Sequence, residues 1–497
     1  MLFNSYAFLF GFLPLALIGF FGLRARGLRG PSVTFLMVAS LAFYAYWKPS
    51  DTWVLVSTIV MNYTIARYMS RLGHGGAKAL LILGICANLG LLVYFKYFDF
   101  LGTNLAALVG KEYVARGIVM PIGISFFTFT QLAYLVDCYR SRDYEGQFTN
   151  YALFVTIFPH LIAGPIIHHA EMRPQFARLR KTPIDMEMIK MGVIIFVIGI
   201  AKKVLLADNL VASADAVFNA ADAGTHFNAA AAWTGTVAYT LQIYFDFSGY
   251  SDMAIGLALL FGLRLPINFN SPYKSRSIIE FWRCWHITLS TWLRDYLYIP
   301  LGGNRGGEWA RLRNVFITFL LGGIWHGAGW TFVIWGALHG TYNVTNHLLR
   351  NKFAPAPARE GWLRSFIKQA CVLLLVMIAW VFFRAKTVGG AIGILQSMAF
   401  IVPAEASRLE QADFAMYFWI VLAAAIALFA PNTQQITAYT QKTTEQLRLP
   451  RIDLLTSLRS GSVAFAASPA VAVVCGLLFA AALACIWRPA IFIYFNF

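Results

Sequence analysis

Histidine is the residue type in this sequence best suited to acid–base chemistry, because its unperturbed pKa of about 6.5 lets it take or give a proton at neutral pH. Nine histidines are present, of which His74, His226 and His347 lie in polar loops or near a helix end. His326 differs, since it lies in the glycine-rich apolar run Leu320–Trp330. An ionisable group in such a segment indicates function, whereas the alternative is a hydrogen bond between helices. The spacing alone leaves both open.

A second histidine, His286, lies in the aromatic run Phe281–Ile287. It is either part of a site or an interfacial side chain packed among tryptophans, and the residue types slightly favour the second. His339 follows His326 by thirteen residues, which is about 20 Å along a continuous helix. If that helix is straight, the two rings cannot share one reacting atom. We therefore expect His339 to be structural.

Two acidic residues, Asp246 and Asp252, lie in an otherwise apolar region and need partners or a wet cavity. Arginines such as Arg283 and Arg294 are candidate partners. We expect the two acids to hold the architecture together, and a direct catalytic role is the less favoured alternative.

The sequence contains few of the motifs that would indicate a metal site or a nucleotide-binding site. His160, His168 and His169 cluster, but Gly164 and Pro165 interrupt the segment, so a shared metal-binding helix face is not expected. The six cysteines include no CxxC pair and no Cys/His ligand spacing. The sequence also lacks a GxxxxGKS/T loop, a GxSxG elbow and an HExxH helix. We expect no metal, no disulfide framework and no permanently bound cofactor.

The elements that must position these residues are membrane helices. Of the 497 residues, 59% are hydrophobic and only 13% are charged, against about 25% charged in an ordinary soluble domain. A helix needs about 20 apolar residues to cross the hydrocarbon core, so the apolar segments predict about 11 to 13 membrane helices. The predicted fold is all-α and multi-pass, with one membrane domain over residues 1–497.

The formal net charge of +17 comes from short basic clusters between apolar segments, which are typical of cytoplasmic loops. Arg24, Arg26 and Arg29 follow the first apolar segment, Leu2–Leu23, and predict that this end lies in the cytoplasm. The segment is too long for a signal peptide and should be retained. Anionic lipid and phosphate-bearing donors are better partners for this charge than nucleic acid.

Residues 263–313 differ from their surroundings because they mix eight lysines and arginines with several aromatic residues. Such a segment is too charged to cross lipid simply. It predicts interfacial or re-entrant helices on the cytoplasmic side, where a soluble, negatively charged donor could bind.

At these motifs the sequence resembles the membrane-bound O-acyltransferase family, and within it the alginate O-acetyltransferase branch that modifies bacterial exopolysaccharides. The resemblance covers most of the chain, and its long middle run is highly specific. The stretches that carry it are Leu2–Pro14, Pro121–Phe129, the run from Gln242 through Trp282–His286 to Tyr298–Asn304, Gly322–Gly327 and Trp380–Ala385.

The resemblance implies a ring of tilted helices around a central funnel that is thin in the middle, so that donor and acceptor meet from opposite sides. In the family the histidine of the Trp-His-Gly motif is catalytic, and it matches His326. The histidine of the Trp-Arg-x-Trp-His motif, His286 here, is the second one associated with the active site. Arg283, Arg294 and Trp285 are the expected donor contacts.

The function implied by the resemblance is movement of an acetyl group from a cytoplasmic thioester, acetyl-CoA, across the bacterial inner membrane. His326 would act as a neutral general base, and His286 would orient the donor or stabilise the developing oxyanion. The final acceptor would be an extracytoplasmic polysaccharide such as alginate or cellulose. A periplasmic partner protein would receive the acetyl group first.

Two alternatives stay open at this stage. D-alanyl transfer to teichoic acid uses the same two histidine motifs with a carrier-protein thioester, although Gly302–Asn304 favours the alginate-like branch. A secondary transporter or polysaccharide exporter could also bury Asp246, Asp252 and histidines along a pathway. The lack of corresponding broken helices in two halves of the sequence counts against transport.

Overall fold

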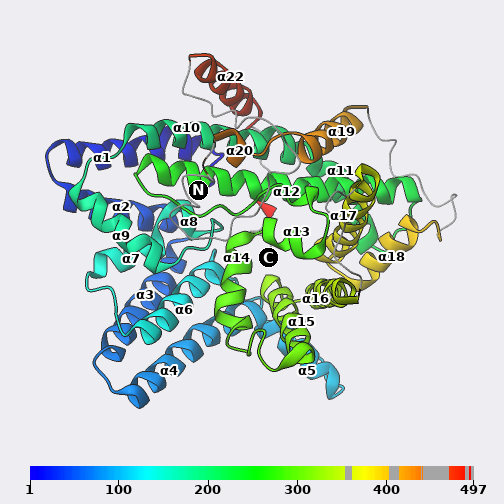
Figure 1. Cartoon of the computed structure of the whole chain (residues 1–497), viewed down its shortest axis with the longest axis horizontal. Coiled ribbons are helices and arrows are strands. Elements are labelled where there is room, and N and C mark those ends of the chain that lie inside the picture. Colours follow the sequence, from blue (N-terminus) through cyan, green and yellow to red (C-terminus); the bar gives the residue numbers. More distant parts are fainter. Residues whose placement is uncertain (353–360, 402–413, 438, 440–468, 487–491, 494–497) are drawn as a thin grey trace. The chain divides into compact units, whose positions relative to one another are not determined.

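The computed structural model of this protein describes residues 1–352, 361–401, 414–437, 439, 469–486 and 492–493. Every regular element in these residues is helical, so the all-α prediction is confirmed (Figure 1). The chain forms two compact units, which we call unit 1 (Met1–Phe196 with Tyr250–Pro266) and unit 2 (Val197–Gly249 with Ile267–Phe497). Two helices contribute to both units: α10 (Met186–Ala201) and α12 (Ala229–Leu260).

Unit 1 contains helices that share buried polar side chains. The elements wholly inside it are η1 (Ala7–Phe12), α1 (Leu13–Ala25), α2 (Arg29–Ala45), α3 (Pro49–Met69), α4 (His74–Leu92), η2 (Val93–Tyr97), α5 (Phe98–Leu108), α6 (Ile124–Ser141), α7 (Phe148–Thr156), α8 (Phe158–Leu161) and α9 (His169–Lys181). Asn62 of α3 bonds to Asn88 of α4 and to Gln131 of α6, over distances of 2.7 to 3.1 Å. Such satisfied amide bonds hold helices together in apolar surroundings.

Unit 2 holds the remaining elements and both His286 and His326. Its elements are η3 (Lys202–Ala207), α11 (Asp208–Asp222), η4 (Pro272–Lys274), α13 (Ile278–Cys284), α14 (Ile287–Leu293), η5 (Arg294–Tyr298), α15 (Gly307–His326), α16 (Trp330–Lys352), α17 (Trp362–Arg384), α18 (Val388–Met398), α19 (Phe414–Phe429), α20 (Thr433–Thr437) and α22 (Pro469–Cys485).

Three helical segments in the described residues are long and apolar enough to cross a membrane: Ala7–Ala25, His74–Leu108 and Trp362–Arg384. Shorter apolar helices cover Val388–Met398, Ala415–Phe429 and Pro469–Cys485. These segments agree with a membrane protein. The count of about 11 to 13 crossings, the single membrane domain and the ring around a funnel stay predictions.

The charged stretch at residues 263–313 contains only short helices before α15, and its interfacial or re-entrant position stays a prediction. Its helices α13 and α14 have seven residues each, which is about 10 Å of helix and far too short to cross a bilayer. They meet at His286, and non-helical backbone precedes them from residue 263 to 271. The side of the membrane on which this stretch lies stays a prediction.

Helices α15 and α16 pack closely against each other through glycine. A methyl group placed on Gly323 would lie 2.7 Å from Cα of Gly336, and one placed on Gly336 would lie 3.0 Å from Cα of Gly323. Any larger residue would separate the two backbones, so both positions require glycine in this packing. The hairpin brings residues from both helices to the surroundings of His326.

Candidate active site

His326 is the last residue of α15 and is almost completely buried, with 4% of its surface exposed. Its imidazole packs edge to face against Trp335, with ring centroids 4.9 Å apart, and against Phe383 at 5.1 Å. The ring of Trp325 also meets the imidazole edge to face, with centroids 4.9 Å apart. This aromatic enclosure excludes water, which strengthens any hydrogen bond that the imidazole makes to a substrate.

The helix ends directly after His326, and this overturns one expectation. Gly327 takes an extended conformation with φ −163° and ψ 153°, so α15 cannot continue into α16. The assumption of one continuous helix from His326 to His339 is therefore wrong. Trp335 contacts His326 at 4.9 Å and His339 at 4.8 Å. His339, which we expected to be purely structural, lies one aromatic ring away from His326.

His286 lies between α13 and α14 and has a backbone conformation that non-glycine residues rarely adopt. Its φ of 43° and ψ of 54° lie in the left-handed region, and its side chain is fully buried. Non-glycine residues avoid this region, and where they are held in it the strain often marks a functional site. The ring of Phe247 meets His286 edge to face at 4.8 Å.

The orientation of His286 is fixed by Asn268, a residue that our sequence analysis missed. Oδ1 of Asn268 accepts the backbone N–H of Thr288 at 3.3 Å and the Thr288 hydroxyl at 2.9 Å. A backbone N–H can only donate, so the Asn268 atom that faces it is the oxygen. Nδ1 of His286 lies 3.1 Å from the same oxygen and must donate to it. The neutral His286 ring therefore carries its lone pair on Nε2.

His286 and His326 border one continuous aromatic cluster of unit 2. The contacts run from His286 through Phe247, Phe269, Trp285, Trp380 and Trp335 to His326, with successive centroid distances of 4.8 to 6.0 Å. The structure thus joins the two histidines that the sequence singled out through packed rings.

The three expected donor contacts lie in different environments. Arg283 on α13 is exposed, and the Arg294 side chain is 53% exposed while its Nε pairs with Oδ1 of Asp295 at 2.6 Å. Trp285 is only 1% exposed and packs inside the aromatic cluster. The two arginines are accessible to a soluble anion, whereas Trp285 is surrounded by other rings. Contact of all three with the donor stays a prediction.

Asp246 pairs with a lysine and not with an arginine, which corrects the expected partners. Nζ of Lys203 lies 2.6 Å from Asp246 Oδ1 and 2.6 Å from Asp208 Oδ1, and all three side chains are buried. The backbone N–H of Ile493 donates to Asp246 Oδ2 at 2.9 Å. Asp246 thus ties α12 to η3 and to the chain near its end, in keeping with the expected structural role. Asp252 is also buried.

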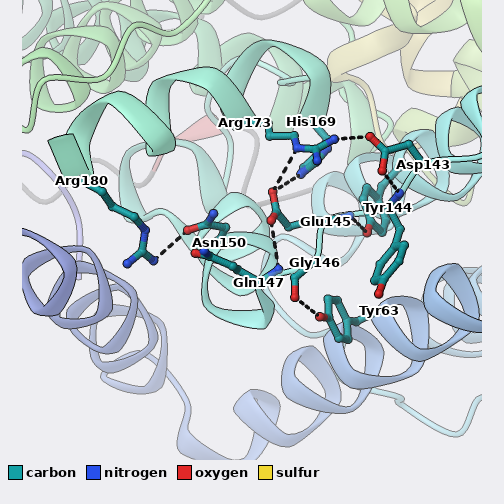
Figure 2. A network of polar contacts seen from close by, with 11 residues as sticks. Tyr63, Asp143, Tyr144, Glu145, Gly146, Gln147, Asn150, His169, Arg173 and Arg180 are labelled. Atoms are coloured by element: carbon teal, nitrogen blue, oxygen red, sulfur yellow. Dashed lines mark hydrogen bonds and ion pairs between the residues drawn. The ribbon is translucent and has the colours of Figure 1, made fainter.

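The histidine cluster of unit 1 has separate partners. Nδ1 of His160 lies 2.8 Å from the carbonyl oxygen of Pro165. His169 faces Glu145 instead, with 3.4 Å between Nε2 and Oε2, as Figure 2 shows. Within the part of the chain that the structure describes, no group of three or more His, Cys, Asp or Glu is arranged to hold a metal ion.

The network in Figure 2 joins the segment after α6 to α9 through charges. Arg173 bonds to Asp143, and its Nε lies 3.8 Å from Glu145 Oε2. Burial alone would raise the pKa of Glu145, but the contact with His169, the Gln147 N–H and the charge of Arg173 bring it below the ordinary value. The Arg173 bond likewise lowers the pKa of Asp143. We call Asp143, Glu145, His169 and Arg173 the polar network of unit 1; its two carboxylates are favoured in their charged forms.

Comparison with known proteins identifies the family. A sequence model described as MBOAT, membrane-bound O-acyltransferase family, matches residues 40–385, which include His286, His326 and His339. The chain belongs to the membrane-bound O-acyltransferase family. The predicted resemblance and the prediction of an acyltransferase are both confirmed, and the transporter alternative finds no support.

The relatives refine the type of acyltransferase. The peptidoglycan O-acetyltransferase of Helicobacter pylori is 43% identical over 430 residues, which cover 80% of each chain. The probable alginate O-acetylase AlgI of Azotobacter vinelandii is 45% identical over 397 residues, 78% of this chain and 75% of that one. A teichoic acid D-alanyltransferase of Streptococcus thermophilus is 24% identical over 340 residues, 63% of this chain and 74% of that one. The protein is a membrane O-acyltransferase of the alginate and peptidoglycan O-acetyltransferase type.

Several residues of the site carried sequence signals that we did not use. Gly327–Gly329 predicts a helix break and hence the return of Trp335 and His339. Lys203, one of two adjacent lysines at the end of an apolar segment, was a natural counter-charge for Asp246. Asn268 had no distinguishing signal, because its role depends on the turn that brings it against His286.

Proposed function

We propose that the protein transfers an acetyl group from acetyl-CoA toward an extracytoplasmic glycan. The O-acetyltransferase names of relatives above 40% identity support acetyl as the acyl group. The observation that carries the proposal is His326, a buried imidazole at the broken end of α15 inside the region that the family model matches. The carbohydrate differs between these relatives, so both alginate-like polymers and peptidoglycan are acceptor candidates.

The chemistry is an acyl exchange that needs one mobile proton. A hydroxyl oxygen attacks the thioester carbonyl carbon, while the His326 imidazole takes the hydroxyl proton. The new C–O bond forms, the C–S bond breaks, and the proton passes from His326 to the leaving thiolate, which gives an ester and free CoA. General-base help of this kind contributes about 10² to 10⁴ in rate.

His286 has a defined part in this proposal. Because Asn268 holds its Nδ1 as a donor, the neutral ring offers Nε2 as a hydrogen-bond acceptor. It is therefore suited to orient a hydroxyl or a water molecule, and less suited to donate to an oxyanion. This refines the expectation that His286 could serve either purpose.

The donor is proposed to enter from the cytoplasm, where its phosphates meet exposed Arg283 and Arg294. The basic clusters that follow apolar segments support this orientation in a bacterial inner membrane. A periplasmic partner protein is proposed to receive the acetyl group first and to pass it on to sugar. Anionic lipid is the expected surrounding of the basic loops.

The test is transfer of radiolabelled acetyl from acetyl-CoA by the purified protein in lipid vesicles, with glycan acceptor and candidate partner supplied. Wild type should transfer label, and a folded His326→Ala protein should not. Equal turnover by the two proteins would remove His326 from catalysis. Transfer from a D-alanyl carrier thioester without transfer from acetyl-CoA would replace the proposed function by D-alanylation.

A further inference from the structure

Two N–H groups are buried without an acceptor near His326, one on Trp335, which packs against it, and one on His339, which packs against Trp335. Within the residues that the structure describes, Trp335 Nε1 and His339 Nε2 have no hydrogen-bond partner, although Trp335 is 1% exposed and His339 is fully buried. Buried polar atoms in folded proteins are nearly always paired, so two adjacent exceptions need an explanation. A substrate oxygen that binds during the reaction would supply the missing acceptor.

The protonation state of His339 follows from its other nitrogen. The indole N–H of Trp282 donates to His339 Nδ1 at 3.2 Å. An indole nitrogen can only donate, so Nδ1 must accept and the neutral ring carries its hydrogen on Nε2. Trp282 therefore makes His339 a donor at Nε2, the mirror image of the arrangement that Asn268 imposes on His286.

The two donors lie on one face of α16. Trp335 and His339 are four residues apart, about one helical turn, and their rings are in contact at 4.8 Å. The Trp335 ring also meets the His326 imidazole at 4.9 Å. The proposed base and the two donors thus belong to a single contact group.

We propose that Trp335 Nε1–H and His339 Nε2–H bind the thioester carbonyl oxygen of the acyl donor as it becomes negatively charged. This inference rests on the proposed function for the role of His326, but it applies to any acyl thioester. Donors fixed in a dry site before the reaction stabilise such an oxyanion far more than water does. It makes His339 a catalytic residue and assigns Trp335 a second role beside packing.

The step balances without any proton leaving the two donors. As the hydroxyl oxygen attacks, the carbonyl π electrons move onto the carbonyl oxygen, and the two N–H groups donate to it. When the C–S bond breaks, those electrons return to the carbonyl and the sulfur leaves with its bonding pair. Trp335 and His339 end the cycle as they began it.

The test compares full-length variants in vesicles. His339→Phe keeps an aromatic ring among Phe281, Trp282 and Trp335 but has no N–H, and Trp335→Phe removes the second donor. We expect each change to lower kcat by about 10² to 10³ with little change in KM. His339→Gln, which restores a side-chain N–H, should recover at least about tenfold of the loss. Trp233→Phe is the matched control, because that indole N–H already bonds to Met398 O at 3.0 Å.

The outcomes separate this inference from the proposed function. Turnover within about twofold of wild type in folded His339→Phe and Trp335→Phe proteins overturns the donor role and leaves acetyl transfer standing. A loss of thermal stability without a change in kcat overturns it in favour of packing. If wild type accepts only a D-alanyl thioester, the proposed function fails, and the same variants are then compared on that donor with the same expectations.

Discussion

The two units of the protein give their buried histidines different polar partners. In unit 1, His169 faces the carboxylate of Glu145, and Arg173 and Asp143 extend the network with further charges (Figure 2). Buried histidines of both units lie against aromatic rings, but in unit 2 Nδ1 of His286 donates to a neutral amide and not to a carboxylate. The first setting stabilises charge, whereas the second keeps the lone pair of a neutral ring for proton transfer.

The difference shows why the number of histidines in a cluster is a poor guide to function. In unit 1, His160 and His169 are close together in the sequence, yet His160 contacts the Pro165 carbonyl and His169 contacts Glu145. Unit 2 brings His286, from the connection between α13 and α14, into one aromatic cluster with His326 of α15 and His339 of α16. The chemistry of the neighbouring groups decides whether a buried histidine can act as a base or belongs to a structural network of charges.

The substitution expected to have the largest effect removes the imidazole of His326 from the aromatic cluster. His326→Ala should lower acyl transfer by about 10² to 10⁴ because it removes the general base. His169→Ala, the matched change in unit 1, should leave kcat within about threefold of wild type. Radiolabelled transfer at saturating donor measures both, and a comparable loss in folded His169→Ala protein would break the comparison.

The next effect concerns the buried charges of unit 2. Lys203→Met leaves Asp208 and Asp246 buried without their cation, which should reduce the free energy of unfolding by about 3 to 5 kcal/mol. Lys190→Met is the control, since its 2.8 Å pair with Glu187 is exposed and should contribute about 0 to 1 kcal/mol. Denaturant unfolding in detergent measures the difference. Equal stability of the two variants would argue that water reaches the Lys203 pair.

A smaller effect sharpens the role of the neutral amide at His286. Asn268→Ala releases the tautomer and orientation of the ring, which should lower kcat by about 10- to 100-fold. Thr288→Val removes a second hydrogen bond to the same Asn268 oxygen but leaves His286 bound to it, and should cost far less. Asn268→Asp should move the acid limb of the pH–rate profile to higher pH, because a carboxylate favours the imidazolium form. Identical profiles for wild type and Asn268→Asp would limit Asn268 to packing.

The smallest expected effect is a pH dependence of stability that comes from the polar network of unit 1. The pKa values of Glu145 and Asp143 are lowered in the folded protein. Their contribution to stability is therefore complete above the ordinary carboxyl pKa of about 4 and is lost as the pH falls through the lowered values. Thermal unfolding between pH 6 and pH 3 should show this loss for wild type and a weaker one for Glu145→Gln. A steeper loss in the variant would have the wrong sign for this account.

The sequence by itself determined the class of the molecule. Its deficit of charged residues and its apolar segments predicted an all-helical membrane protein, and the resemblance of the motifs around His286 and His326 to those of a known family predicted an acyltransferase. Both predictions are confirmed. They succeed because bulk hydrophobicity and short motifs are local properties, which can be read without knowing which segments meet.

The tertiary structure decided how the histidines are used. His339 was dismissed because its distance from His326 was measured along one helix, whereas the chain turns at Gly327 and brings it back behind Trp335. Asp246 was matched to arginines by charge, yet Lys203 is the cation that η3 places within 2.6 Å. The tautomers of His286 and His339 depend on Asn268 and Trp282, which are 18 and 57 residues distant in sequence. Hydrogen bonds between residues so far apart form only after the helices have packed, so no local pattern could have predicted them.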